Sequence, residues 1–331
     1  MNDFAVRSVE KYDQEKTVLV SRDGIALLLV LWVLTILMVI VLSFSLMART
    51  ETLSTRSFKE RVEKKFLAEA GIERGIVEIF YGKQNAGVES GDANTWKTDG
   101  TPYPAQIGED SYTVRITDES GKIDINALTD SSGIILKNLL IASGVKDEDA
   151  DTIVDSTLDW KDKNVGMHRL HGAGDDYYMS LPNPYQPTHS DFDSVEELLL
   201  VKGVTPEILY GSGERKGIID FLTCYSKTPG VNINAAPKEI LTAVPGITPE
   251  LADLIIDFRQ NKKIANAQEV GIQPQSAPYI TYADSNTFTI EAVGHKGDSA
   301  KGYAVKATVT LEGGSTPYKV LYYKSPVNIA Q

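Results

Sequence analysis

Residues 24–49 read GIALLLVLWVLTILMVIVLSFSLMAR. Between Ile25 and Leu42 no residue is charged, and Thr35 is the only polar side chain. The run from Ile25 to about Ala48 has the roughly 20 residues that a helix needs to cross the hydrocarbon core of a bilayer. The sequence therefore predicts one membrane-spanning helix near the N-terminus, which anchors a folded, water-exposed remainder.

The helix is expected to continue beyond the membrane. From Arg49 to about Tyr81 there is no proline, and apolar residues recur among charged ones near helical spacing. This pattern predicts that the second half of one long helix lays an apolar stripe on a domain. A secretory signal peptide has a shorter apolar core with a small-residue cleavage site after it. Here the small residue, Gly24, precedes the core, so cleavage there would leave the helix on the mature chain.

Composition excludes several kinds of protein. The chain has 331 residues and a net charge of −12, and such an acidic balance argues against nonspecific attraction to nucleic acid or anionic lipid. About 280 residues follow the expected anchor, which is enough to bury a sizeable core. Cys224 is the only cysteine, so neither a disulfide within the chain nor a thiolate zinc cluster can form. We expect its thiol to be buried as a small hydrophobe.

The remainder of the chain predicts an α+β fold. Residues 82–108 are rich in turn-forming residues and are expected to be a loop. Alternation of apolar and polar residues predicts strands at Ser111–Ile116, Lys122–Asn126, Thr287–Val293, Tyr303–Leu311 and Tyr318–Tyr323. Helices are expected at Ile134–Ser143, Asp147–Asp162, Ser194–Val201, Pro206–Tyr210, Lys216–Thr223, Pro237–Ala243 and Pro249–Asn261. The strands predict one antiparallel sheet that covers the amphipathic part of the N-terminal helix, with the helices as a large insertion.

Gly24 directly before a long apolar helix resembles the N-terminus of type IV pilins and type II secretion pseudopilins. The resemblance implies that a prepilin peptidase cuts between Gly24 and Ile25 and that Ile25 is then methylated. Most of these proteins have a glutamate at the fifth mature position, which neutralises the N-terminal ammonium of a neighbouring subunit in the filament. This chain has Leu29 there. Because an unpaired carboxylate in an apolar core is expensive, Leu29 fits a subunit at the filament tip. The alternative is an ordinary signal anchor with a chance glycine.

The order of the elements is similar to that of K-type minor pseudopilins (general secretion pathway protein K), which carry a large α-helical insertion. The matching phrases are Gly121–Leu128, Asp159–Asp162, Asp175–Tyr178 and Val231–Ala236. The resemblance implies a leader at residues 1–24, an N-terminal helix at 25–82 with its membrane span at 25–48, a pseudopilin sheet module at 107–126 and 284–325, and an inserted helical domain at 127–283.

Such a protein is not an enzyme. The resemblance implies a minor pseudopilin that caps the tip of the type II secretion pseudopilus and supports protein export across the outer membrane. Its partners would be other minor pseudopilins, the major pseudopilin and the prepilin peptidase, with no nucleic acid among them. It would cross the bacterial inner membrane once and hold the bulk of its chain in the periplasm.

Hard oxygen ligands gather in one Gly-rich stretch, at Asp159, Asp162, Asn164, Asp175 and Asp176. Calcium prefers six to eight such oxygens in a flexible arrangement, and the resemblance implies a structural calcium loop here. Relatives have a glutamate where this chain has Gly174, and Lys161 and Lys163 add opposing charge. The alternative is that these carboxylates cap helices and solvate a loop.

Two other classes of protein stay open. His168 and His171, with Asp175, suggest a tethered metal-dependent hydrolase, although no third clear zinc ligand is present. The segments Leu199–Glu207 and Leu241–Glu250 look like helix-hairpin-helix turns, which bind DNA phosphates through free N–H groups at a helix N-terminus. A membrane-tethered DNA receptor would use them. However, proline removes a donor from each turn and a glutamate adds negative charge where a phosphate would lie.

Overall fold

The computed structural model describes residues 22–84, 96–164, 168–213, 215–297, 299, 301–312 and 316–327. Helix α1 spans Arg22–Gln84 without interruption, which confirms the single long helix that the sequence predicts. By compactness the chain divides into two units, Met1–Glu60 and Arg61–Gln331.

The first unit contains the apolar part of α1. Large apolar side chains between Ile25 and Met47 are 40% to 74% exposed. Among the described residues, α1 is the one helix long and apolar enough to cross a membrane, and its most apolar window has a mean hydropathy of 3.3. Such a surface is stable in lipid and costly in water.

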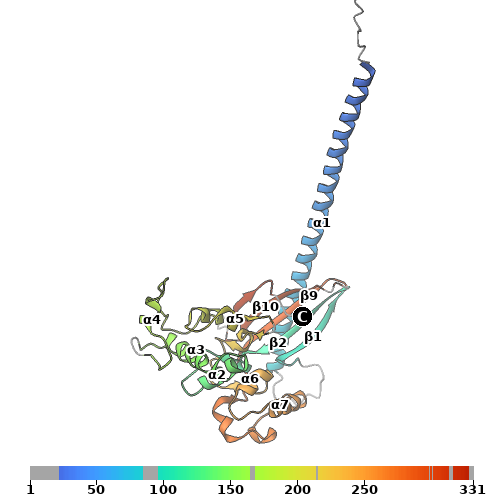
Figure 1. Cartoon of the computed structure of the whole chain (residues 1–331). Coiled ribbons are helices and arrows are strands. Elements are labelled where there is room, and N and C mark those ends of the chain that lie inside the picture. The colour runs from blue at the N-terminus through green and yellow to red at the C-terminus, as the bar shows by residue number, and fades with distance from the viewer. Residues whose placement is uncertain are drawn as a thin grey trace, which may run out of the picture. The chain divides into compact units, whose positions relative to one another are not determined.

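A five-stranded antiparallel sheet forms the first layer of the second unit (Figure 1). Its spatial order is β1-β2-β9-β10-β11, and every neighbouring pair is antiparallel. The strands are β1 (Asp99–Ile107), β2 (Asp110–Asp118), β9 (Thr287–His295), β10 (Tyr303–Thr310) and β11 (Lys319–Lys324). The sheet is thus made from two segments that are far apart in the sequence.

The second half of α1 packs on this sheet through glycines. A Cβ atom placed on Gly71 would lie 2.9 Å from Cβ of Ala292, and one on Gly75 would lie 2.8 Å from Cγ2 of Ile290. On the sheet, a Cβ on Gly294 would overlap the main chain of α1 at Lys64. Glycine on both surfaces therefore permits a close approach of helix to sheet. The core between them contains Ala68, Ile72, Ile76, Ile79, Val114, Ile116, Phe288, Ile290, Val305 and Val309.

Between β2 and β9 the chain forms a helical insertion with a hydrophobic core of its own. Its longer elements are α2 (Gly133–Ala142), α3 (Asp147–Trp160), α4 (Asp175–Met179), η2 (Val195–Leu200), α5 (Pro206–Tyr210), α6 (Lys238–Ala243) and α7 (Pro249–Asn261). Short two-residue strands close it: β3 (Ile123–Asp124) pairs with β6 (Leu222–Thr223), and β7 (Val231–Asn232) pairs with β8 (Ile280–Thr281). The α+β fold with a helical insertion is therefore confirmed.

The insertion contains one helical hairpin twice. Residues 144–155 and 246–257 are identical at six of twelve positions and fit the pattern Gly-(Val/Ile)-x-x-Glu-x-Ala-Asp-x-Ile-(Val/Ile)-Asp. The first glycine of each has a positive φ, 84° at Gly144 and 86° at Gly246, which glycine adopts without strain. In each hairpin a lysine of the first helix pairs with the repeated aspartate: Lys137 with Asp151, and Lys238 with Asp253.

The loop before each hairpin repeats as well. The Asn126 side chain binds both main-chain groups of Phe192, at 2.7 and 3.0 Å, and the Asn234 side chain binds both groups of Ile264, at 2.8 and 2.9 Å. Parallel strand pairs enclose each unit, β3 with β6 and β7 with β8. The two phrases IDINA and VNINA are thus equivalent anchoring turns.

One buried carboxylate holds the point where the insertion leaves the sheet and returns to it. Asp118, the last residue of β2, accepts hydrogen bonds from the N–H of Ser120 at 2.8 Å and from the hydroxyl of Ser285 at 2.6 Å. Ser285 lies just before β9. Burial raises the pKa of Asp118, and these donors oppose that rise. The bonds join the two ends of the insertion.

Three expected elements were wrong. Strand β1 lies within the expected loop 82–108, because an edge strand tolerates Pro102 and Pro104. The expected strand Lys122–Asn126 is only β3, which pairs in parallel with β6 and does not join the main sheet. The expected helix Lys216–Thr223 does not form, because Lys216 pairs with Gly211 and Leu222–Thr223 pair with β3 as β6, which leaves only a 3-10 turn at Ile219–Phe221.

Gly75→Val should lower the Tm of the detergent-solubilised chain by about 5 °C, because the new side chain overpacks the contact with Ile290. Circular dichroism melting is the measurement. Gly82→Val is the matched control, since a Cβ there has nothing within 4 Å. Equal melting temperatures for the two variants would contradict the close packing of α1 on the sheet.

Candidate functional site

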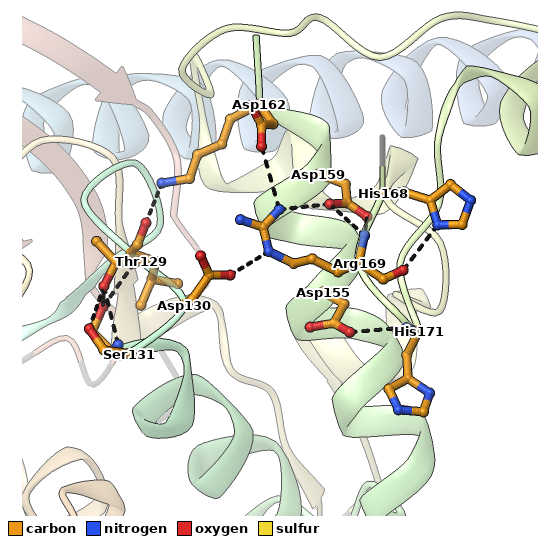
Figure 2. Close-up of polar contacts among 12 residues, drawn as sticks. Thr129, Asp130, Ser131, Asp155, Asp159, Asp162, His168, Arg169 and His171 are labelled. Carbon is orange, nitrogen blue, oxygen red and sulfur yellow. Dashed lines mark hydrogen bonds and ion pairs between the residues drawn. The ribbon is translucent and has the colours of Figure 1, made fainter. Parts of the chain in front are cut away.

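The acidic stretch predicted to bind calcium lies after α3, and Arg169 lies at its centre (Figure 2). Nη1 of Arg169 is 2.7 Å from Oδ1 of Asp159 and 3.7 Å from Oδ2 of Asp162. Its Nε is 2.6 Å from Oδ1 of Asp130. The hydrogen bond to Asp130 is the largest cause of the raised pKa of Arg169, and the same bond lowers the pKa of Asp130.

Both carboxylate oxygens of Asp159 are engaged. Oδ1 accepts from the guanidinium of Arg169, and Oδ2 accepts from the main-chain N–H of Arg169 at 3.0 Å. A Cβ placed on Gly172 would overlap Oδ2. Asp159 is 5% exposed, so its charge is compensated within the chain, as a buried carboxylate requires. Its position at the end of α3 and the glycine beside it are what permit this contact.

Asp175 has a separate partner, His189. Nε2 of His189 is 2.8 Å from Oδ1 of Asp175, and Nδ1 is 2.8 Å from the carbonyl oxygen of Asp162. Both partners are acceptors, so the imidazolium satisfies the two bonds together. Burial alone would lower the pKa of His189, but these bonds outweigh it and raise that pKa. Sequence reasoning missed His189, because it is distant in the chain from the acidic stretch.

The two remaining predicted ligands are Asn164 and Asp176. Asn164 donates to Oδ1 of Asp162 from both its main-chain and its side-chain nitrogen, each at 3.0 Å. Asp176 lies in the first turn of α4, and its Oδ1 would be 3.2 Å from a Cβ placed on Gly174. Within the described ranges, no three His, Cys, Asp or Glu side chains form a group that could hold a metal ion. As placed, the donors do not fit a calcium ion, and the calcium site stays a prediction that no comparison tests.

The residues of the hydrolase alternative do not converge either. Nδ1 of His168 contacts the carbonyl oxygen of Arg169 at 3.0 Å, while the main-chain N–H of His171 donates to Asp155 at 3.0 Å (Figure 2). Both side chains are exposed. Asp175 pairs with His189 instead. The geometry therefore gives this alternative no support.

The hairpin turns are covered by the chain itself. A Cβ on Gly246 would lie 2.6 Å from Nε2 of Gln275, and the hydroxyl of Ser276 donates to the carbonyl of Pro245 at 2.7 Å. A Cβ on Gly203 would lie 3.0 Å from Cγ1 of Ile153 in α3. The turns that a phosphate would approach in a DNA-binding hairpin thus serve internal packing.

Carboxylates occupy the helix N-termini that come after these turns. Hydrogen bonds from their own main-chain N–H groups, and from the Thr205 and Thr248 hydroxyls, lower the pKa of Glu207 and of Glu250. The positive ends of α5 and α7 therefore already face negative charge. A DNA receptor is the less favoured function.

The residues predicted for membrane processing lie within α1. Gly24 and Ile25 come directly after the first residues of the helix, and a Cβ on Gly24 would meet nothing within 4 Å. Leu29 is 59% exposed. Residues 1–21 of the predicted leader lie outside the described residues. Cleavage and methylation stay predictions.

Comparisons with known proteins agree with this architecture. Residues 121–210 match the family model of type II secretion system protein K, and residues 226–271 match the helix-hairpin-helix motif. The chain is 26% identical over 199 residues to type II secretion system protein K of Pseudomonas aeruginosa, covering 58% of this chain and 57% of that protein. It is 27% identical over 205 residues to the protein of the same name from Aeromonas hydrophila, covering 56% and 60%. The chain thus spans less than two thirds of these relatives.

A solved structure has the same fold. It is a chain of the GspK-GspI-GspJ complex from the type 2 secretion system of enterotoxigenic Escherichia coli, with a TM-score of 0.56 and 15% identity over 83% of this chain and 100% of that chain. The long apolar helix packed on an antiparallel sheet, with a helical insertion, is the fold that this chain shares with that structure. Residues 121–210, within that insertion, are similar to the corresponding domain of type II secretion system protein K.

Gly172→Ala should lower the Tm by about 5 °C, because the methyl group displaces the Asp159 carboxylate from Arg169. Thermal melting in detergent is the measurement. Gly82→Ala is the control, and it should leave the Tm unchanged or raise it slightly because alanine favours helix. A Gly172→Ala protein that melts with the wild type would contradict the placement of Asp159 against this glycine.

Proposed function

We propose that this chain is the K-type minor pseudopilin that caps the tip of a type II secretion pseudopilus and supports protein export across the outer membrane. The observation that carries the proposal is the protein K domain, residues 121–210, inserted within a pseudopilin sheet. The role is structural and not enzymatic. The bulky insertion suits an end position, because a shaft subunit must pack neighbours on both sides.

The apolar part of α1 is the assembly element in this proposal. It would hold the chain once in the inner membrane, with the remaining domain in the periplasm, and would then enter the filament. A prepilin peptidase would cut after Gly24, and the new N-terminus, Ile25, would be methylated. Support comes from the uncharged run that begins at Ile25 and from the open surroundings of Gly24.

Leu29 supports the tip position. A shaft subunit gains from a carboxylate that pairs with the terminal ammonium of a neighbour, whereas an unpaired carboxylate in an apolar surround costs several kcal/mol. The subunit at the end has no such neighbour above it. An apolar side chain at this position, 59% exposed on the surface of α1, is therefore the favourable choice.

The partners would be the other minor pseudopilins and, below them, the major pseudopilin. The structural neighbour belongs to a complex with GspI and GspJ, and this chain shares its fold. We infer a corresponding complex with two minor pseudopilins of the same secretion system.

In cells with an active prepilin peptidase, the membrane-extracted chain should begin at a methylated Ile25. The Gly24→Val variant should retain residues 1–24, because the peptidase requires a residue without a side chain before the bond that it cuts. Intact-mass spectrometry is the measurement, and Gly82→Val in the same helix is the control that should still be processed. A wild-type chain that retains its leader would overturn the proposal.

Leu29→Glu should reduce both co-purification with the other minor pseudopilins and secretion of the system's substrates, because it places an unpaired carboxylate at the apolar end. Pull-down from detergent extracts and assay of secreted protein are the measurements. Leu29→Ile should behave as the wild type. Full secretion by Leu29→Glu would count against the tip position.

A further inference from the structure

The guanidinium of Arg169 has the surroundings expected of a bound cation. Three carboxylates from different parts of the first hairpin unit point toward it: Asp130 before α2, Asp159 at the end of α3 and Asp162 in the following turn (Figure 2). The distances from its nitrogens to their oxygens are 2.6, 2.7 and 3.7 Å. A flat guanidinium with five N–H donors suits carboxylates that approach in one plane.

A divalent ion at this place would have to displace the arginine. Asp159 is 3% exposed at its side chain, and both of its oxygens already accept hydrogen bonds from Arg169. The guanidinium of Arg169 therefore occupies the place that a cation would take between Asp130 and Asp159.

We propose that Arg169 replaces a bound metal ion in this chain. Its guanidinium ties residues 168–172 to the α2–α3 hairpin, so the acidic stretch is ordered without calcium. The proposal concerns how the insertion is stabilised and does not depend on the position of the protein in a filament.

The connection lies next to the main aromatic cluster of the insertion. Trp160 comes directly after Asp159 and contacts Tyr178 and Phe192, with ring centroids 5.2 and 6.3 Å apart. Trp160 is 1% exposed. Loss of the arginine should therefore loosen both the acidic stretch and the packing of these rings, and it should leave Asp130, Asp159 and Asp162 without their shared cation. Carboxylates in that state attract calcium.

The test measures thermal unfolding of the full chain in detergent, with EGTA or with calcium chloride, for the wild type and for Arg169→Gln. The wild type should melt at the same temperature in both buffers. Arg169→Gln should melt about 5 °C lower in EGTA and should recover part of that loss in calcium. The Tm of Arg169→Lys in EGTA should lie between those of the wild type and Arg169→Gln, because lysine keeps the positive charge but lacks the planar guanidinium.

Lys238→Gln is the matched control. It removes the exposed ion pair with Asp253 in the second hairpin, away from the acidic stretch, and it should change the Tm little and create no response to calcium. Two results would overturn the proposal: a wild-type Tm that rises in calcium relative to EGTA, or an Arg169→Gln protein that melts with the wild type. If Arg169→Gln does not fold, calorimetric titration of the wild type with calcium decides, since saturable binding of one ion there contradicts the proposal.

Discussion

The close approach of α1 to the antiparallel sheet is the constraint on which the second unit depends. Gly71 and Gly75 on the helix, and Gly294 on β9, remove the side chains that would hold the two surfaces apart. The contact buries the apolar stripe of the helix against β2, β9 and β10. It also joins strands that precede and follow the insertion, because β2 and β9 are neighbours in the sheet. The same helix, α1, therefore has an apolar first part suited to lipid and a second part that packs on the sheet.

The insertion interrupts the sheet without disturbing its register. Asp118 at the end of β2 binds Ser285 just before β9, so the ends of the insertion are held together within the fold. Burying a carboxylate is unfavourable, and the raised pKa of Asp118 reflects that cost, which the hydrogen bonds offset. Between these ends the chain uses the same hairpin twice, with the same glycine conformation and the same lysine–aspartate pair.

The two copies of the hairpin differ in the segment after the second helix. After α7 the chain returns through short 3-10 turns to β8, whereas after α3 it makes the longer acidic stretch that contains Arg169. There the carboxylates pair with cations that the chain supplies, Arg169 and His189. Hairpin turns that resemble DNA-binding elements pack against Ile153 and Ser276 instead. Both features are internal to the fold, which agrees with a structural role.

The sequence by itself determined the apolar helix, its continuation past Arg49, the position of Gly24 and the alternating strands β2, β9 and β10, because each depends on local composition and periodicity. It also contains the hairpin repeat, in the two segments that share Gly-x-x-x-Glu-x-Ala-Asp, and the contacts common to both hairpins show that these segments are equivalent.

The tertiary structure decided the rest. Edge strand β1 contains prolines that predict a loop, and its pairing with β2 overrides them. Asp159 pairs with Arg169, ten residues further along the chain, and Asp175 pairs with His189, fourteen residues further along. Whether a cluster of carboxylates binds a metal or the chain's own cations depends on which side chains the fold brings to within about 3 Å, and spacing along a sequence does not contain that distance.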